Sequence, residues 1–194
     1  KIADQNSDIG AQQIATGEAD LLLGFDMVAS VGGDAFPSLA GKTHVVGNSR
    51  VSNTVIFQFN PDDKVDNSLL EGKLAERVGE QHLHLVDAST LALKLCGDTI
   101  ASNMFMVGFA CQNGLLPLSV EAIERAIELN GTAVAFNLNA FRLGRVAAHD
   151  LDKLLALIEP AQPLAALPQS ADELIAHRSA HLTGYQNAQY AQRY

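Results

Sequence analysis

Short apolar runs alternate with helical patterns along the first half of this 194-residue chain. Residues 19–26 (ADLLLGFD) and 42–49 (KTHVVGNS) have the length and apolar content of buried strands, and residues 82–87 (HLHLVD) alternate as a strand does. Residues 67–81 (NSLLEGKLAERVGEQ) place Leu70, Leu74 and Val78 on one stripe of an amphipathic helix. Strands that alternate with helices are typical of a parallel sheet, so we expect an α/β, Rossmann-like fold with a mostly parallel sheet.

The segments between these elements have less regular patterns. Residues 8–17 predict a short helix that begins at Asp8, and residues 27–39 predict a helix interrupted by Gly32 and Gly33. Residues 51–59 could form an edge strand or an extended connection. Residues 88–97 predict a helix with Asp87 as its N-cap.

The strand patterns stop at Asp98, and the rest of the chain predicts a helical C-terminal flank. Expected helices cover residues 98–114, 116–131, 133–145 and 149–158. Asn130-Gly131 could form a hairpin turn, but the helical period before it favours a helix C-cap, after which Thr132 would begin the next helix. Residues 159–170 hold three of the six prolines and predict a linker, after which Ser170 begins a last amphipathic helix.

Charge and composition argue against several classes of function. A net charge of −9 opposes a nucleic-acid or anionic-membrane partner, since both require a basic surface. The sequence has no apolar run of about 18 residues, so we expect no transmembrane helix. Cys96 and Cys111 form no CxxC pattern, and we expect no zinc or iron–sulfur site within this chain. Cysteines in apolar surroundings are typical of a reducing compartment, and we expect a cytoplasmic location.

The histidines give no clear metal site. His177 and His181 have the spacing of a metal-binding helix, but Arg178 follows the first histidine where a metalloprotease needs Glu, so an exposed polar face is favoured. His82 and His84 alternate on a predicted strand and lack a nearby third ligand. His44 and His149 stand alone in the sequence. We therefore expect no metal ligands.

The glycines give no complete cofactor motif. Gly24 and the Gly32-Gly33 pair do not form GxGxxG. Gly97-Asp98 has the opening of a thiamine diphosphate motif, but the second half is missing, and a helix cap explains Asp98 better. No nucleophile–base pair emerges from the spacing. We expect no catalytic residue and no cofactor within this chain.

Polar residues at two element ends are candidates for binding. Asn48 and Ser49 fall at the carboxyl end of a predicted strand, where open α/β sheets bind ligands. Arg145, after Gly144, could bind a helix C-terminus or a carboxylate.

Asn103 lies in a predicted helix that is apolar nearly all round. An unpaired buried amide costs about 2 kcal/mol or more, so we expect Asn103 to be buried and hydrogen-bonded. Its partner could be the helix that carries Asn137 and Asn139, or it could lie at a domain or ligand interface.

Residues 85–145 contain the motifs Asp87-Ala88, Asn103-Met104, Gly108, Leu116 to Ser119, Asn130-Gly131, Asn137 and Ala140 to Arg145. With these motifs they resemble the γ module of 2-oxoacid:ferredoxin oxidoreductases, and GEADLLLGFD resembles an earlier part of that module. Residues 170–194 resemble the segment after this module in fused bacterial indolepyruvate ferredoxin oxidoreductases.

The resemblance implies an enzyme that oxidatively decarboxylates an aryl-pyruvate to an acyl-CoA, with thiamine diphosphate, coenzyme A and [4Fe-4S] clusters, and passes electrons to ferredoxin. In that family the γ module holds neither thiamine nor clusters but packs against the catalytic domains. It implies partners in those domains, and we expect a homo-oligomer. Asn48, Ser49 and Asn103 are candidates for the coenzyme A side of the site or for a domain interface.

The resemblance also divides the chain. Residues 1–158 would form the γ-type module, and residues 159–194 a linker and helix that lead to a further domain. The family's module opens with a glycine loop and a first strand ahead of Lys1, and together with the non-Met first residue this favours a fragment of a longer chain. The alternative is a free-standing Rossmann-like binding or adaptor module without a redox role.

Overall fold

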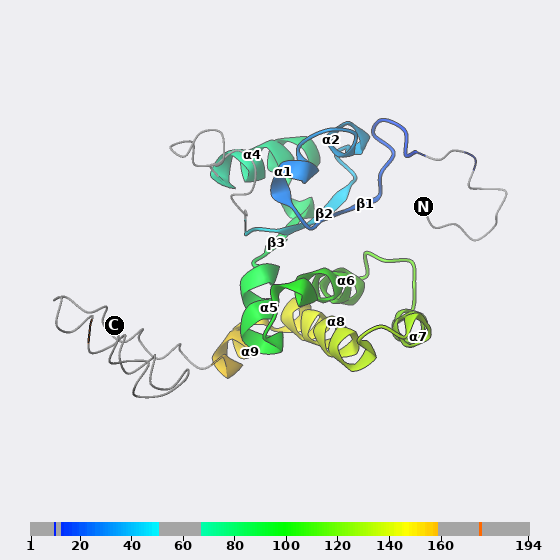
Figure 1. Cartoon of the computed structure of the whole chain (residues 1–194). Helices are drawn as coiled ribbons and strands as arrows, with labels where there is room; N and C mark the ends of the chain where they lie inside the picture. The colour runs from blue at the N-terminus through cyan, green and yellow to red at the C-terminus, as the bar shows by residue number, and fades with distance from the viewer. Residues whose placement is uncertain (1–9, 11–12, 51–66, 159–174, 176–194) are drawn as a thin grey trace. The chain divides into compact units, whose positions relative to one another are not determined.

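The computed structural model describes residues 10, 13–50, 67–158 and 175. Within them, β1 (Leu21–Gly24), β2 (His44–Asn48) and β3 (Leu83–Val86) form a three-stranded sheet in the order β1-β2-β3, with both pairs parallel (Figure 1). The register places Leu21 beside His44 and Val45 beside Leu83. The predicted α/β fold with a parallel sheet is confirmed.

Short helices and one long helix cover the first face of the sheet. These are α1 (Met27–Ser30), α2 (Ala35–Ser38) and α4 (Asn67–Val78). The predicted stripe of α4 is buried, and it packs with Met27 and Val45 in one hydrophobic core. Gly33, which has a φ of 50°, separates α1 from α2, so the expected helix over residues 27–39 is two short helices.

The helical flank begins after β3 with α5 (Ala88–Cys96), the 3-10 turn η3 (Thr99–Ala101) and α6 (Ser102–Gln112). α6 contacts β1 and β2 from the side opposite α4, and Val46 of β2 is fully buried (Figure 1). The side chain of Asp87 caps α5, and that of Asp98 caps η3, by accepting backbone hydrogen bonds. The sheet therefore has helices on both faces.

Two glycines let α6 pack closely against α8 (Val134–His149). A Cβ atom added to Gly108 of α6 would clash with the carbonyl group of Phe141 in α8. A Cβ atom added to Gly144 of α8 would clash with the carbonyl group of Phe105 in α6. Phe105 and Phe141 are fully buried, so this crossing is the centre of the helical flank.

Asn130-Gly131 ends a helix, as predicted. α7 (Val120–Asn130) is capped at its start by the Ser119 hydroxyl, and it ends at Gly131, which has a φ of 70° and is left-handed. The N-cap of α8 is Ala133 rather than the predicted Thr132, and no side chain caps this helix start. The Asn137 amide donates to the Thr132 carbonyl oxygen at 2.9 Å.

The predicted ends of two helices need correction. α8 continues past residue 145 to His149, and α9 (Leu151–Leu157) follows, because Asp150 interrupts the helix and its carboxylate accepts a hydrogen bond from the Lys153 backbone at 3.0 Å. The described residues of the expected helix at 8–17 are not helical, since Gly17 turns the chain and bonds to the Pro37 carbonyl oxygen. The possible strand at 51–59, the linker at 159–170 and almost all of the last helix lie outside the described residues.

Candidate functional site

The carboxyl ends of the strands meet at Asn48, as the sequence predicts. Asn48 is only 4% exposed, and its Nδ2 donates to Ser89 Oγ at 2.8 Å and to the Phe25 carbonyl oxygen at 3.4 Å. Phe25 follows β1 and Ser89 lies in the first turn of α5, so one amide joins three elements. Both amide protons of Asn48 are thus used within the chain, and its side chain holds the edge of the sheet together.

The residues after Asn48 bring polar groups to the surface of this edge. The Ser49 backbone N–H donates to the Val86 carbonyl oxygen at 3.0 Å, and the Ser49 carbonyl oxygen accepts from Asn67 Nδ2 at 3.2 Å. Arg50 is exposed, and its Nη1 donates to Thr90 Oγ1 at 2.7 Å. A guanidinium group carries further N–H donors, so Arg50 can also bind an anion.

The chemistry of this edge is that of binding. The Ser89 and Thr90 hydroxyl groups accept hydrogen bonds from Asn48 and Arg50, and none of the hydrogen bonds between described residues here joins a hydroxyl group to a general base. Sequence reasoning found Asn48 and Ser49 from their place after a strand, but it missed Arg50 and Asn67. The only sequence signal for Arg50 was its position directly after Ser49.

The prediction for Asn103 is wrong within the described chain. Asn103 is exposed on the first turn of α6, and its amide makes no hydrogen bond to another described residue. The buried face of α6 instead contains Phe105 and Gly108, and Asn103 is two residues away from Phe105, on the other side of the helix. Asn137 and Asn139 bond elsewhere, to the Thr132 carbonyl oxygen and, at 4.0 Å, to Cys96 Sγ.

Three histidines that are separate in the sequence lie together at the amino ends of β2 and β3. His44 Nδ1 is 3.4 Å from His84 Nε2, and the rings of His44 and His82 have centroids 4.7 Å apart. The interpretation of His44 as isolated is therefore wrong, because the parallel pairing of β2 and β3 brings the three rings together. Burial lowers the pKa of His84, and the nearby His44 and His82 lower it further.

Metal ligation finds no support in this part of the chain. Among the described residues, no group of three or more His, Cys, Asp or Glu side chains could hold a metal ion. Cys96 and Cys111 are free and belong to different hydrophobic clusters. Burial raises the pKa of both thiols, which favours the protonated form, whereas an iron–sulfur cluster requires several thiolates together. The described cysteines do not fit such a cluster.

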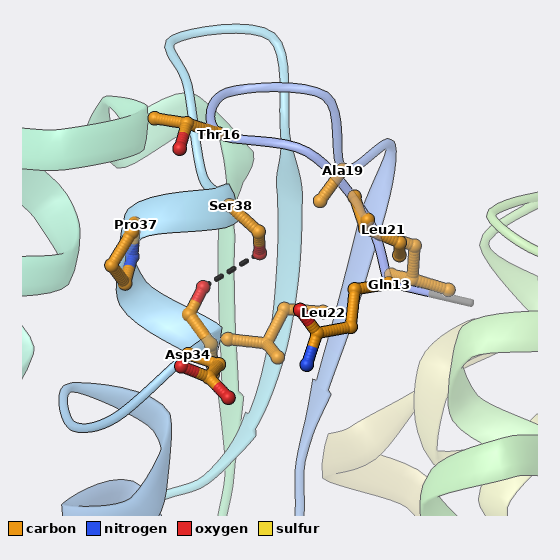
Figure 2. Close-up of a pocket in the computed structure, with 10 residues that line it drawn as sticks. Gln13, Thr16, Ala19, Leu21, Leu22, Asp34, Pro37 and Ser38 are labelled. Carbon is orange, nitrogen blue, oxygen red and sulfur yellow. Dashed lines mark hydrogen bonds between the residues drawn. The ribbon is translucent and has the colours of Figure 1, made fainter. Parts of the chain in front are cut away.

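A pocket of about 440 Å³ lies between β1, α2 and the segment before β1 (Figure 2). Leu21 and Leu22 provide apolar lining, and Gln13, Thr16 and Asp34 provide polar groups. The Ser38 hydroxyl, which also lines it, donates to the Ala35 carbonyl oxygen at 2.6 Å. Among the described residues, its lining includes no His, Cys or Lys and none of the residues chosen from the sequence. The pocket can bind a small group but offers no nucleophile–base pair.

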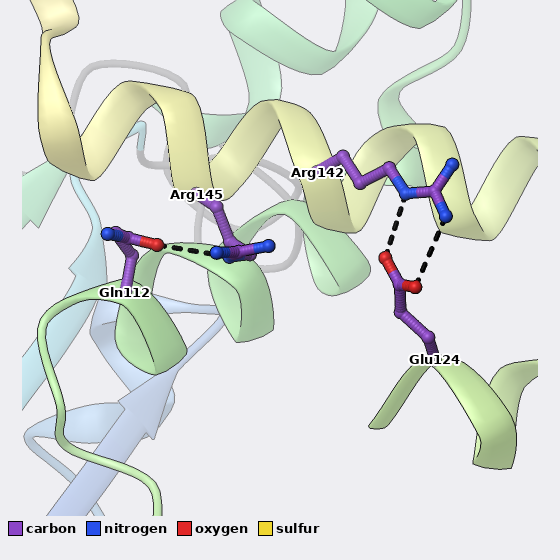
Figure 3. Close-up of polar contacts among 4 residues, drawn as sticks. All are labelled: Gln112, Glu124, Arg142 and Arg145. Carbon is purple, nitrogen blue, oxygen red and sulfur yellow. Dashed lines mark hydrogen bonds and ion pairs between the residues drawn. The ribbon is translucent and has the colours of Figure 1, made fainter. Parts of the chain in front are cut away.

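A basin of about 380 Å³ lies at the ends of α6 and α8. It is lined by Gln112, Arg142, Arg145, Val146 and His149. Arg145 Nε donates to Gln112 Oε1 at 3.0 Å, and Gln112 is the last residue of α6 (Figure 3). Arg145 thus lies at a helix C-terminus, which is one of the two roles that the sequence suggested. Arg142 gave no sequence signal.

In the described residues, no helix is long and apolar enough to span a membrane.

Comparison with known proteins assigns the family. No curated protein sequence matches the chain. The crystal structure of pyruvate oxidoreductase subunit PORC from Thermotoga maritima aligns at 21% identity with a TM-score of 0.43, over 66% of this chain and 64% of that one. The sequence profile of the pyruvate ferredoxin/flavodoxin oxidoreductase family matches residues 2–147, a range that includes the whole sheet and the crossing of α6 and α8. The chain therefore belongs to the pyruvate ferredoxin/flavodoxin oxidoreductase family.

Proposed function

We propose that this chain is the γ-type module of a thiamine-dependent 2-oxoacid:ferredoxin oxidoreductase of the indolepyruvate type. The observation that carries the proposal is the family match over residues 2–147. The resemblance of residues 170–194 to fused bacterial enzymes supports the indolepyruvate type. The complete enzyme would oxidatively decarboxylate an aryl-pyruvate to an acyl-CoA and pass the electrons to ferredoxin in the cytoplasm.

The module would be accessory to the active site. The carboxyl edge of its sheet offers binding groups without a general base, and its described cysteines do not fit an iron–sulfur cluster. The thiamine and cluster sites would therefore lie on the catalytic domains, which are its proposed partners in a homo-oligomer. Residues 1–158 would form the module, and residues 159–194 would connect it to a further domain.

Coenzyme A is the cofactor whose chemistry fits the described residues. It carries phosphate groups, and Arg50 is an exposed guanidinium at the edge where open α/β sheets bind ligands. In this proposal Arg50 binds a phosphate, and Asn48 and Ser49 hold the backbone that presents it. Asn103, which is exposed on α6, would lie at the interface with a catalytic domain.

Steady-state turnover of the complete enzyme tests this function. Indole-3-pyruvate, phenylpyruvate and pyruvate would be supplied in turn with coenzyme A, and ferredoxin reduction would be followed by its visible absorbance. The proposal predicts reduction that depends on coenzyme A and is fastest with an aryl-pyruvate. A free-standing adaptor module predicts no turnover with any 2-oxoacid, and that result would overturn the proposal. Fastest turnover with pyruvate would contradict the indolepyruvate type alone.

A variant pair tests the role of Arg50. Arg50→Ala should raise the KM for coenzyme A about tenfold, because a charge-assisted hydrogen bond contributes about 1.5–3 kcal/mol, and leave the KM for the 2-oxoacid unchanged. Arg77→Ala is the matched control, since Arg77 is also exposed but lies on α4 and contacts Pro37 and Phe36. Equal KM values for coenzyme A in both variants would show that Arg50 does not bind it.

A further inference from the structure

The basin at the ends of α6 and α8 contains a cation, Arg145, that no described residue neutralises by a direct ion pair. Arg142 is paired with Glu124 through two hydrogen bonds of 2.8 and 3.2 Å (Figure 3). Arg145 lies one helical turn further along α8, and its side-chain partner is the neutral amide of Gln112. In the part of the chain that the structure describes, no carboxylate lies within ion-pair distance of Arg145.

The acidic residues near this basin do not fill it. Hydrogen bonds to its own backbone and to Ser119 lower the pKa of Glu121, and the hydrogen bond from Arg142 lowers the pKa of Glu124, while the charge of Arg145 makes the smallest contribution to each. Glu121 is engaged by hydrogen bonds at the start of α7, and Glu124 is held by Arg142. Neither carboxylate lines the basin. No described carboxylate therefore binds the remaining donors of Arg145, which can bind a further group.

The residues around Arg145 combine exposed apolar area with an arginine, which is typical of a protein interface. Val146 is 43% exposed beside it, and the aliphatic stems of Arg142 and Arg145 extend the apolar surface. Exposed apolar area next to an arginine fork is common at protein interfaces, and the planar fork matches a carboxylate with two parallel hydrogen bonds. The buried crossing at Gly144 fixes the helix from which Arg145 projects, and the hydrogen bond to Gln112 Oε1 orients its guanidinium group.

We propose that this basin docks an Asp or Glu side chain of the enzyme's catalytic part, with Arg145 as the anchor of the contact. The inference rests on the proposed function for the identity of the partner. The chemistry of the site favours a carboxylate of a protein partner, because the Arg145 guanidinium forms no ion pair with a described residue, attracts an acidic side chain and repels a basic one. Val146 and the arginine stems then cover apolar surface of the partner around the ion pair.

A zero-length cross-link identifies the partner carboxylate directly. Arg145→Lys keeps the charge and provides an amine, which a carbodiimide joins to a carboxylate that touches it. In the complete enzyme, mass spectrometry should find position 145 linked to an Asp or Glu of the catalytic part. Arg125→Lys is the control, because Arg125 is exposed on α7 and pairs with Glu128 of the same helix, so it should link only within α7. Links from position 145 only to Glu121 or Glu124, or no link, would overturn the proposal.

A charge swap separates docking from a structural role of Arg145. Arg145→Glu should slow ferredoxin reduction at least about tenfold, and changing the cross-linked carboxylate to Lys in the same enzyme should restore most of the rate. Failure of this second change to restore any activity would contradict the docking contact. Turnover of the unsubstituted enzyme is measured beside them, so loss of the proposed function and loss of the docking contact are distinguished.

Discussion

Gly108→Ala should destabilise the helical flank, because the new methyl group would meet backbone rather than a flexible side chain. Its Cβ atom would lie 2.8 Å from the Phe141 carbonyl carbon and 3.2 Å from the Arg145 nitrogen. Carbon atoms in contact need about 3.5 Å, so α6 and α8 would have to separate by roughly 1 Å. Phe105, Ala140 and Phe141 are fully buried at this crossing and would all lose contacts.

The size of the effect follows from two opposing contributions. Overpacking of a tight core costs about 1–3 kcal/mol, and a backbone clash belongs at the upper end because no rotamer relieves it. Replacing Gly by Ala within a helix returns about 1 kcal/mol of helix propensity. We expect a net loss of about 2 kcal/mol, which corresponds to a decrease in Tm of about 4–8 °C for a chain of this length. Gly144→Ala should behave alike, since its Cβ atom would lie 2.7 Å from the Phe105 carbonyl carbon.

Gly72→Ala is the matched control. Gly72 lies inside α4, is exposed and has nothing within 4 Å of an added Cβ atom, so this variant should gain about 0.5–1 kcal/mol. Thermal and urea unfolding followed by far-UV circular dichroism would compare the three variants. The reasoning about close helix packing is refuted if Gly108→Ala is as stable as Gly72→Ala.

Three smaller perturbations test other parts of the account. Asn48→Ala should lower the free energy of unfolding in urea by about 1–3 kcal/mol, because it leaves buried groups unpaired. Asn113→Ala, at an exposed site, should change this free energy by less than about 0.5 kcal/mol. Equal losses in the two variants would contradict the role of Asn48. Folding lowers the pKa of His84 from 6.5, so below about pH 6.5 the unfolded chain binds a proton that the folded chain does not, and stability should fall as the pH decreases. His84→Phe should flatten the dependence of Tm on pH. An unchanged dependence would rule this out. Gly131→Ala should cost about 1 kcal/mol in thermal unfolding, because it forces an L residue into the left-handed C-cap of α7, and no loss would argue against that cap.

Periodicity predicted most of the fold because it reports which faces are buried. The stripe of Leu70, Leu74 and Val78 gave α4, and the helical period before Asn130 distinguished a helix end from a hairpin. The ends of helices were predicted less accurately, since they depend on single side chains. Asp150 is an example, because its carboxylate accepts a hydrogen bond from the Lys153 backbone at the start of α9. Local sequence patterns show which face of a helix is buried, but three-dimensional contacts decide which residue caps its end.

Contacts between distant segments were not readable from the sequence. Gly108 and Gly144 stood out only as members of a family motif, and their pairing across two helices emerged from the structure. Asn103 was expected to be buried because its neighbours are apolar, but the side of α6 that faces α8 is set by the glycines and Phe105. Likewise, the register of β2 and β3 brings His44 to His84 across residues that no local pattern connects.

We propose that residues 1–194 belong to a 2-oxoacid oxidoreductase and perform none of its redox chemistry themselves. Two measurements test this on the purified chain and on the complete enzyme: the visible absorption spectrum and the 2-oxoacid-dependent reduction of ferredoxin. Both samples are measured under the same conditions, with thiamine diphosphate and coenzyme A supplied. The account predicts a colourless, inactive chain and a brown enzyme that reduces ferredoxin. Charge-transfer bands or turnover in the chain alone, or a complete enzyme that turns over no 2-oxoacid, would contradict it.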